Sequence, residues 1–478
     1  MYDVAIVGAG IIGACVARKL SGYAIKTVVI EKDSDVGTGC TRANSGIVHG
    51  GYDAKPGSLK AKYNVLGQKM YDRLAKELRF PFKRNGSLVI AFDEKDIPRL
   101  EQLKEQGVEN GLLDLRIAHK DELKELEPNL SENVYAALVV PAGGIVSPYE
   151  MAIAFAENAA QNGVEFMLDS EATSIDKKDG YFLISTPKGK VEARIIVNAA
   201  GEHSDEINNM LSEHKLKIIP RSGEYCLIDR TEGGLVKHTV FQLPTKMGKG
   251  ILVTPTAEGN LLIGPTSADI EEKGNTATTM QGLGEVLEKA RLSVKRVPIN
   301  KIITSFCGLR PRTELDEFII EEAKDVPGLI NLCGIESPGL TAAPAIAEEV
   351  GRMIAERLNP AENKGFDPIR KITAPFRDMT GDERRAAIKE NPDYGHIICR
   401  CETVTKAEII AALRSPLPVR SLDAIKRRTR AGMGRCQAGF CSMRLLDIIA
   451  EECGISITDV TKSGGGSNIL IERNKTSI

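Results

Sequence analysis

The sequence lacks the features of a membrane-spanning, secreted or nucleic-acid-binding protein. No run of about 18 uncharged apolar residues occurs, so no segment is long enough to cross a bilayer as a helix. The first apolar stretch, Val4–Val7, begins too early to leave room for a signal peptide. The net charge of −2 argues against a general nucleic-acid binder, because such proteins carry a large positive excess.

Disulfide bonds are not expected either, although the chain has ten cysteines. Six of them are scattered singly, at Cys15, Cys40, Cys226, Cys307, Cys333 and Cys453. Without a signal peptide, this distribution indicates a reduced, cytoplasmic protein.

The other four cysteines are grouped near the C-terminal end. Cys399 and Cys401 form a C-x-C pair, and after 34 intervening residues Cys436 and Cys441 form a C-x4-C pair. Thiolates are soft ligands that select iron–sulfur clusters or zinc over hard cations. C-x-C is tighter than the usual zinc spacing, which favours a [2Fe–2S] cluster. Structural zinc and a chance grouping are the alternatives.

The N-terminal segment has the pattern of a dinucleotide-binding turn. The strand Val4–Val7 leads into a loop with Gly8, Gly10 and Gly13, followed by a helix that ends near Leu20. Such glycines permit a tight turn, close approach of a pyrophosphate and packing of the helix on the strand. The helix N-terminus then offers free N–H groups and a positive dipole to phosphates.

A second strand, Thr27–Ile30, ends at Glu31, whose carboxylate can accept from ribose hydroxyls. Strand, turn, helix and acid together favour a dinucleotide site over a glycine-rich turn without a ligand. This pattern alone does not separate FAD from NAD.

Two later segments repeat the junction of an apolar strand with a glycine turn. Arg194–Val197 precedes Gly201, and Leu329–Cys333 precedes Gly334 and an alanine-rich helix over 341–358. We therefore expect an α/β fold in which one Rossmann-like domain is assembled from separated segments.

The stretches between these segments contain alternating strands such as Ser87–Phe92 and Ile251–Thr254, which predict a mixed or antiparallel α+β substrate domain. The expected division is a main part over 1–370, a linker over 371–395, a small helical cysteine domain over 396–455 and a tail over 456–478. Within the main part, the nucleotide-binding segments are about 1–80, 140–215 and 305–360, and the substrate domain is about 81–139 and 216–304.

With the segment from Gly39 to Lys62, the chain resembles the FAD-dependent oxidoreductases of the D-amino-acid oxidase/glycerol-3-phosphate dehydrogenase superfamily. It is most similar to the branch that holds L-2-hydroxyglutarate dehydrogenases and small glycerol-3-phosphate oxidases. The motifs that carry the resemblance span about residues 1–370 and are Gly8–Gly13, Asn44–Lys62, Asn198–Gly201, Gly308–Pro311 and Ser337–Leu340.

The resemblance implies noncovalent FAD, with Glu31 on the adenosine ribose and Thr41, Arg42 and Ser45 along the flavin ring. A helix beginning near Ser337 would direct its dipole at the flavin pyrimidine and stabilise the reduced form. The full set of implied cofactor contacts is Gly8, Gly10, Gly13, Glu31, Thr41, Arg42, Ser45, Gly201, Gly334, Ser337, Gly339, Leu340 and Thr341.

Three residues are the candidates for substrate chemistry. His49 is the predicted base for a hydroxyl proton, because imidazole titrates near neutral pH; the alternative is that it only packs beside the flavin. Arg310 is similar to the arginine with which the family binds a carboxylate or phosphate. Lys249 lies near a lysine position of related glycerol-3-phosphate oxidases and would add a second cation; the alternative is a loop-tip lysine.

The cysteine module, from Tyr394 to Thr405 and from Gly434 to Cys441, resembles the [2Fe–2S] domain of bacterioferritin-associated ferredoxin at all four ligand positions. Between its cysteine pairs runs the basic segment Lys426–Arg430. We expect this segment to be a solvated helix face, or else to offset the cluster charge or bind an acidic electron-transfer partner.

The combined pattern predicts a dehydrogenase rather than an oxidase, since a cluster beside the flavin lets electrons leave without dioxygen. The leading hypothesis is oxidation of sn-glycerol 3-phosphate, a small anionic 2-hydroxy substrate of glycerol metabolism, to dihydroxyacetone phosphate. The alternatives are L-2-hydroxyglutarate, an amine, or a non-catalytic redox subunit of a larger complex. The electron outlet would be a partner subunit, a soluble carrier or a peripheral contact with membrane quinone.

Overall fold

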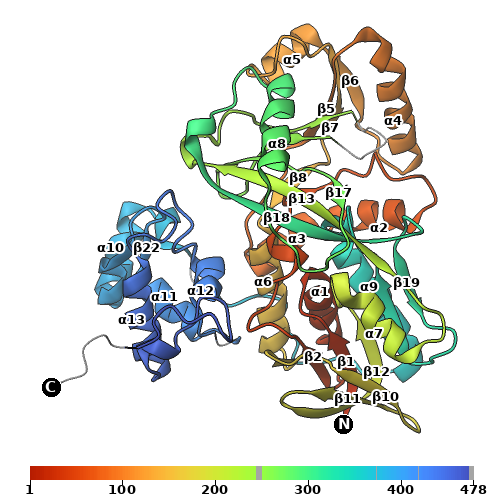
Figure 1. Ribbon diagram of the computed structural model, residues 1–478, viewed down its shortest axis with the longest axis vertical. Coiled ribbons are helices and arrows are strands. Elements are labelled where there is room, and N and C mark those ends of the chain that lie inside the picture. The colour runs from red at the N-terminus through yellow and green to blue at the C-terminus, as the bar shows by residue number, and fades with distance from the viewer. Residues whose placement is uncertain (244–249, 373, 418, 473–478) are drawn as a thin grey trace.

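Two sheets and a small helical part make up the chain, which the computed structural model describes over residues 1–243, 250–372, 374–417 and 419–472. The sheet nearest the N-terminus lies at one end of the molecule and the second sheet lies at the other (Figure 1). The C-terminal helices sit to one side, next to the first sheet. None of the described helices is both long and apolar enough to cross a membrane.

The first sheet has eight strands, of which β20, β12, β1, β2 and β9 run parallel in that order. Its strands are β1 (Tyr2–Val7), β2 (Thr27–Ile30), β9 (Glu165–Met167), β10 (Ser174–Lys177), β11 (Phe182–Thr186), β12 (Gly189–Asn198), β19 (Ile319–Glu322) and β20 (Leu329–Cys333). The predicted assembly of this sheet from segments far apart in the sequence is confirmed.

Helices cover both faces of the first sheet. On one face, Val4 and Ile6 of β1 share a core with α1 (Ile11–Leu20), α6 (Pro148–Gln161) and α9 (Gly339–Leu358). On the other face, Ala5 and Val7 share a core with α7 (Ser204–Leu211). Because Val4–Val7 of β1 are buried on both sides of the sheet, this part of the strand is apolar throughout instead of alternating.

The second sheet is mixed, which is one of the two alternatives that the sequence leaves open. Its nine strands are antiparallel neighbours except β14 and β5, which pair in parallel. They are β5 (Ser87–Ala91), β6 (Arg116–His119), β7 (Ala136–Val140), β13 (Ile218–Ile228), β14 (Thr239–Gln242), β15 (Leu252–Pro255), β16 (Leu261–Gly264), β17 (Ala268–Asp269) and β18 (Ile302–Thr313). Helices α4 (Ile97–Glu109), α5 (Lys120–Leu126) and α8 (Met280–Ser293) pack on it.

A three-stranded sheet connects these two parts. It consists of β3 (Ile47–Val48), β8 (Gly144–Val146) and β4 (Phe82–Lys83), with β8 in the centre. The nearby helices are α2 (Leu59–Gln68), which packs on α9, and α3 (Tyr71–Leu78), which packs on α6. Along the sequence, β3 follows the predicted cofactor-binding segments and β4 precedes β5 of the second sheet.

The C-terminal part is a helical domain with its own apolar core. Its elements are α10 (Gly381–Glu390), the hairpin β21 (Ile397–Cys399) and β22 (Val404–Thr405), α11 (Lys406–Leu413), α12 (Leu422–Thr429) and α13 (Ser442–Cys453). Helix α10 lies inside the range that the sequence assigns to a linker. The tail returns to the domain, because Thr461 pairs with Ser421 and with Asn468.

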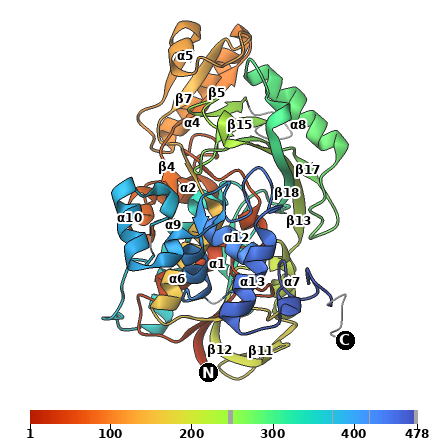
Figure 2. The same cartoon turned by 90° about the vertical axis from the view of Figure 1, so that its left-hand side faces the viewer.

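The basic segment at the end of α12 is not a solvated helix face, so this expectation is wrong. Arg427 and Arg428 both donate to Asp35, with N–O distances of 2.7 and 2.9 Å, and Asp35 has no exposed side-chain surface. Arg428 also lies 3.4 Å from Glu157 of α6. The arginines therefore hold the C-terminal domain against α6, where Figure 2 shows α12 and α13 in front of the first sheet. Their partners are too distant in sequence to be inferred from local pattern.

Asp35→Ala should loosen this interface, because it leaves two buried guanidinium groups without their shared carboxylate. We expect a loss of about 3–5 kcal/mol in urea unfolding. Asp72→Ala is the control. Asp72 pairs with Arg84 at 58% side-chain exposure, so its substitution should cost less than about 1 kcal/mol.

The pH dependence of stability gives a second test of the interface. Burial alone would raise the pKa of Asp35, but Arg428 and Arg427 hold it below its usual value. The ionised Asp35 carboxylate therefore stabilises the folded state fully above its unfolded-state pKa. This stabilisation is lost as the pH falls through the lower folded-state pKa. Equal unfolding midpoints for the two variants would contradict this account.

Candidate functional site

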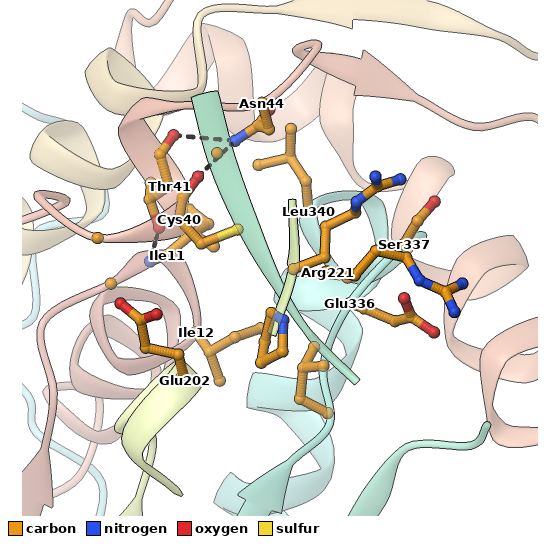
Figure 3. Close-up of a pocket in the computed structure, with 18 of the residues that line it drawn as sticks. Ile11, Ile12, Cys40, Thr41, Asn44, Glu202, Arg221, Glu336, Ser337 and Leu340 are labelled. Atoms are coloured by element: carbon orange, nitrogen blue, oxygen red, sulfur yellow. Dashed lines mark hydrogen bonds between the residues drawn. The ribbon is translucent and has the colours of Figure 1, made fainter. Parts of the chain in front are cut away.

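A cavity of about 1110 Å³ lies between the two sheets and collects most of the predicted site residues. Its walls come from the β1–α1 turn, the segment after β2, strands β13 and β18, and the start of α9 (Figure 3). The predicted residues that line it are Gly8, Gly10, Glu31, Thr41, Ser45, His49, Gly201, Arg310, Ser337, Gly339 and Leu340. Four others, Gly13, Arg42, Gly334 and Thr341, do not line it.

The glycine turn leaves no room for side chains. Gly8 has φ +102°, and a Cβ there would lie 2.4 Å from the carbonyl oxygen of Ala199. A Cβ on Gly13 would lie 2.0 Å from the carbonyl oxygen of Gly8. Gly13 thus serves the packing of α1 against the turn, which is why it is absent from the cavity wall.

The N-terminus of α1 opens into the cavity beside Thr41. Gly10 provides no side-chain cap, and the hydroxyl of Thr41 accepts the N–H of Ile11 at 3.0 Å, as Figure 3 shows. The other early N–H groups of this helix are suited to a phosphate. Arg42, the next residue of the short 3-10 helix Cys40–Arg42, is exposed and does not line the cavity that Thr41 lines.

Glu31 occupies the far end of the cavity and is almost fully buried. Its two oxygens accept the N–H groups of Ala9 at 2.7 Å and Asp33 at 2.9 Å. Burial raises the pKa of Glu31 to about 7, although both hydrogen bonds oppose the shift. A buried carboxylate at this position suits hydroxyl donors such as those of a ribose.

The start of α9 is hydrogen-bonded to His49, the residue that follows β3. The Thr341 hydroxyl accepts the backbone N–H of His49 at 2.9 Å. Thr341 therefore supports His49 without lining the cavity itself. Ser337 Oγ lies 3.3 Å from His49 Nε2, and the ring of Phe241 lies 5.9 Å from the imidazole ring. These contacts fix the imidazole at the cavity surface. A general base has to lie there to be within hydrogen-bond reach of a bound substrate.

Arg310 projects from β18 into the same cavity. Its Nη2 donates to the carbonyl oxygens of Ser222 and Thr266 at 3.1 and 2.9 Å. Among the described residues no carboxylate lies within ion-pair distance of Arg310, and its buried Nε has no hydrogen-bond partner. The guanidinium charge is therefore available to an anion.

Sequence reasoning missed Arg221, which lies directly opposite Arg310 in the β13–β18 pairing and also lines the cavity. Directly opposite residues share a sheet face, so the two side chains are neighbours. Arg221 makes a two-point ion pair with Asp269 at 2.6 and 3.0 Å. No local sequence signal reveals this pairing. Lys249, the predicted second cation, lies outside the described residues.

The four grouped cysteines come together as two pairs in the C-terminal domain. Cys401 and Cys436 have their sulfur atoms 3.6 Å apart, close to the ~3.7 Å expected for two thiolates on one tetrahedral metal at about 2.3 Å. Cys399 and Cys441 form the other pair; the hydrogen bond from Cys441 lowers the pKa of Cys399 to about 6. Within the described ranges, no three His, Cys, Asp or Glu side chains form a single metal site. Two pairs suit the two irons of a [2Fe–2S] cluster better than one zinc ion.

Comparison with known families assigns both parts of the chain. Residues 3–353 match the FAD dependent oxidoreductase family, and residues 397–451 match the BFD-like [2Fe-2S] binding domain. The two matched ranges contain the cavity and the four cysteines, respectively.

Several relatives have curated names or solved structures. A protein of Caloramator mitchellensis named glycerol 3-phosphate dehydrogenase is 49% identical over 481 residues, covering 100% of both chains. A glycerol 3-phosphate oxidase of Mycoplasma pneumoniae is 34% identical and covers 76% of this chain and 96% of its own. The structure of the dithionite-reduced L-alpha-glycerophosphate oxidase of Mycoplasma pneumoniae with FAD bound superposes with a TM-score of 0.74 at 31% identity, covering 78% of this chain and 99% of its own.

Glu31→Gln should change the pH dependence of the cofactor-free protein. The pKa of Glu31 lies near 7 in the folded chain and 4.5 in the reference state, so the folded state holds a proton that the unfolded state loses between these values. Stability therefore falls as the pH rises from about 4.5 to 7, by up to ~3 kcal/mol. Urea unfolding of the glutamine variant should lack this slope, and FAD should bind more weakly by titration. An unchanged slope would show that Glu31 does not titrate there.

Cys399→Ser should remove the cluster and leave the flavin in place. Each iron needs two thiolates, so the variant should lose iron and acid-labile sulfide and the electron paramagnetic resonance signal of the reduced cluster. Cys453→Ser is the matched control in the same domain, at the end of α13. Full iron content in the Cys399 variant would remove this residue from the ligand set.

Proposed function

We propose that this chain, which belongs to the FAD dependent oxidoreductase family, oxidises sn-glycerol 3-phosphate to dihydroxyacetone phosphate and releases the electrons through a [2Fe–2S] cluster. The observation that carries the proposal is the full-length similarity to the dehydrogenase of Caloramator mitchellensis, which extends over the cavity and the cysteine module alike. Bound FAD supplies the two-electron acceptor, and the cluster supplies a one-electron outlet.

His49 is proposed as the base that takes the proton of the substrate hydroxyl. Its Nε2 faces Ser337 Oγ at 3.3 Å, and its backbone is held by Thr341. A substrate hydroxyl that donates to Nε2 would lie beside Ser337 Oγ, and the fixed imidazole would set the orientation of the carbon that loses its hydrogen.

Arg310 is proposed as the main contact of the substrate phosphate. Its charge is uncompensated by carboxylates in the described part of the chain, so binding a dianion there needs no ion pair to break. Arg221 supplies a second, partly neutralised cation from the opposite strand. Lys249 remains a proposed further cation that the described residues do not include.

We also propose the division into a main part over 1–370, a linker over 371–395, a cluster domain over 396–455 and a tail. The electron acceptor is proposed to be a partner subunit, a soluble carrier or peripheral quinone, and the location cytoplasmic. The described helices offer no bilayer span.

Anaerobic reduction of the cluster-containing protein tests the substrate. Flavin absorbance should bleach rapidly with glycerol 3-phosphate and slowly or not at all with L-2-hydroxyglutarate. Bleaching only by the hydroxy acid would overturn the phosphate ester as substrate. Bleaching by neither would direct attention to amines or to a subunit active only in a complex.

Arg310→Gln should raise KM for glycerol 3-phosphate and lower kcat/KM by about 10²–10³-fold, the loss expected when one partner of a charged contact is truncated. Arg312→Gln is the matched control on the same strand, because Arg312 does not line the cavity and lies 3.8 Å from Asp269 and Asp316. Equal steady-state kinetics for both variants would remove Arg310 from the substrate site.

A further inference from the structure

Arg430, the residue that follows α12, contacts the turn that holds two of the cysteines. Its backbone is left-handed, with φ 68°, and its side chain is 5% exposed. Nε donates to Glu402 Oε2 at 2.8 Å, and Glu402 follows Cys401 directly. The guanidinium therefore fixes the backbone next to a cluster ligand.

The same guanidinium reaches helix α6, which packs on the first sheet, and the loop between β15 and β16 of the second sheet. Nη1 donates to the hydroxyl of Tyr149 in α6 at 3.0 Å, and Nη2 donates to Asn260 Oδ1 between β15 and β16 at 3.4 Å. Glu258 of that loop lies 3.9 Å away. We call Arg430, Glu402, Tyr149, Asn260 and Glu258 the Arg430 junction, because one side chain joins three parts of the fold.

Tyr149 connects this junction to the wall of the cofactor cavity. Helix α6 starts at Pro148, directly after β8, and β8 pairs with β3 through Ile145 and Ile47. Ile47 lines the cavity. A short path of paired backbone and packed side chains thus runs from the cavity to Tyr149 and Arg430.

On the cluster side, the loop after Arg430 lies against both Tyr149 and the cysteine turn. The Tyr149 hydroxyl lies 3.4 Å from the sulfur of Met433. A Cβ on Gly434 would lie 2.2 Å from Cβ of Cys401, so the two backbones are in direct contact. Cys436 follows two residues later and pairs with Cys401 at 3.6 Å. Movement of this loop would therefore displace the ligands of the cluster.

We propose that Arg430 and Tyr149 are positioning residues that fix the Cys401 turn relative to the flavin cavity, so that electrons pass from flavin to cluster within one polypeptide. The proposal rests on the proposed function only for the presence of both cofactors. Arg427 and Arg428 anchor α12 to Asp35 and α6 independently. The Arg430 junction differs from this anchor, because one partner of Arg430, Glu402, is adjacent to the proposed cluster ligand Cys401.

Arg430→Gln tests the proposal with rapid mixing. Two electrons enter the flavin as the substrate is oxidised, and one then moves to the oxidised cluster, which is seen in freeze-quenched samples by electron paramagnetic resonance. Flavin reduction should keep its wild-type rate, while transfer to the cluster slows by about tenfold or more, as misplacing reacting groups by ~1 Å can do. Arg430→Lys, which keeps the charge and the same left-handed backbone, should restore part of the rate.

Tyr149→Phe is a second test in case Arg430→Gln does not fold. It removes one hydroxyl and leaves the ion pairs of Arg430 in place. It should slow electron transfer less than Arg430→Gln and raise hydrogen exchange in the loop over 430–436. Arg414→Gln is the matched control: Arg414 lies on the same domain, is 70% exposed and pairs only with Glu452 among the described residues. It should change neither quantity.

Photoreduction of the flavin by an external donor separates this proposal from the assigned substrate. If glycerol 3-phosphate fails to bleach the flavin, the proposed function fails, and light-driven reduction still measures the transfer to the cluster. Wild-type transfer rates and wild-type hydrogen exchange in Arg430→Gln, with full flavin and iron content, would overturn the positioning role.

Discussion

The carboxylate of Asp35 governs how the two redox parts of this chain meet. It lies just after β2, within the dinucleotide-binding unit, and it accepts from both Arg427 and Arg428 of the cluster domain without any exposed surface. Burying three charges is costly, and ion pairs of this kind are weak evidence for stability. Their value is geometric: only one placement of α12 brings both guanidinium groups to the carboxylate. Glu157, which also binds Arg370 at 2.6 Å, extends this arrangement along α6. The cluster domain is thereby a fixed part of the enzyme rather than a tethered one.

The features that sequence reasoning predicted are those whose signal lies within a short segment. The strand, glycine turn, helix and acid from β1 to Glu31 follow one another within about 30 residues, and each glycine has a steric reason that the structure displays, such as Gly8 against Ala199. The grouped cysteines were recognisable for the same reason. Assembly of the first sheet from distant segments followed because the strand-to-glycine junction recurs. The alternating strands predicted a separate substrate domain, but they did not decide between a mixed and an antiparallel sheet.

The features that it could not predict depend on pairings between distant residues. Arg427 and Asp35 are 392 positions apart, so nothing near the basic segment Lys426–Arg430 distinguishes a buried interface from a solvated helix. The role of Arg221 depends on its register opposite Arg310, which is set only when β13 and β18 pair. Thr41 and Arg42 are adjacent in a short 3-10 helix, yet one is buried at the cavity and the other is exposed. Local propensity sets elements, and long-range register decides which side chains share a site.

Arginine side chains have two roles in this fold: some connect parts of the structure, and others offer positive charge to the cavity. The carboxylates around each guanidinium distinguish the two roles. Arg427, Arg428 and Arg430 each lie within ion-pair distance of a buried carboxylate, which offsets part of their charge and fixes their side chains as rigid connectors. Arg310 meets only carbonyl oxygens in the described structure, which orient the planar group without cancelling its charge. Arg221 is intermediate, because Asp269 occupies two of its donors. A dianionic substrate would therefore find its strongest attraction at Arg310.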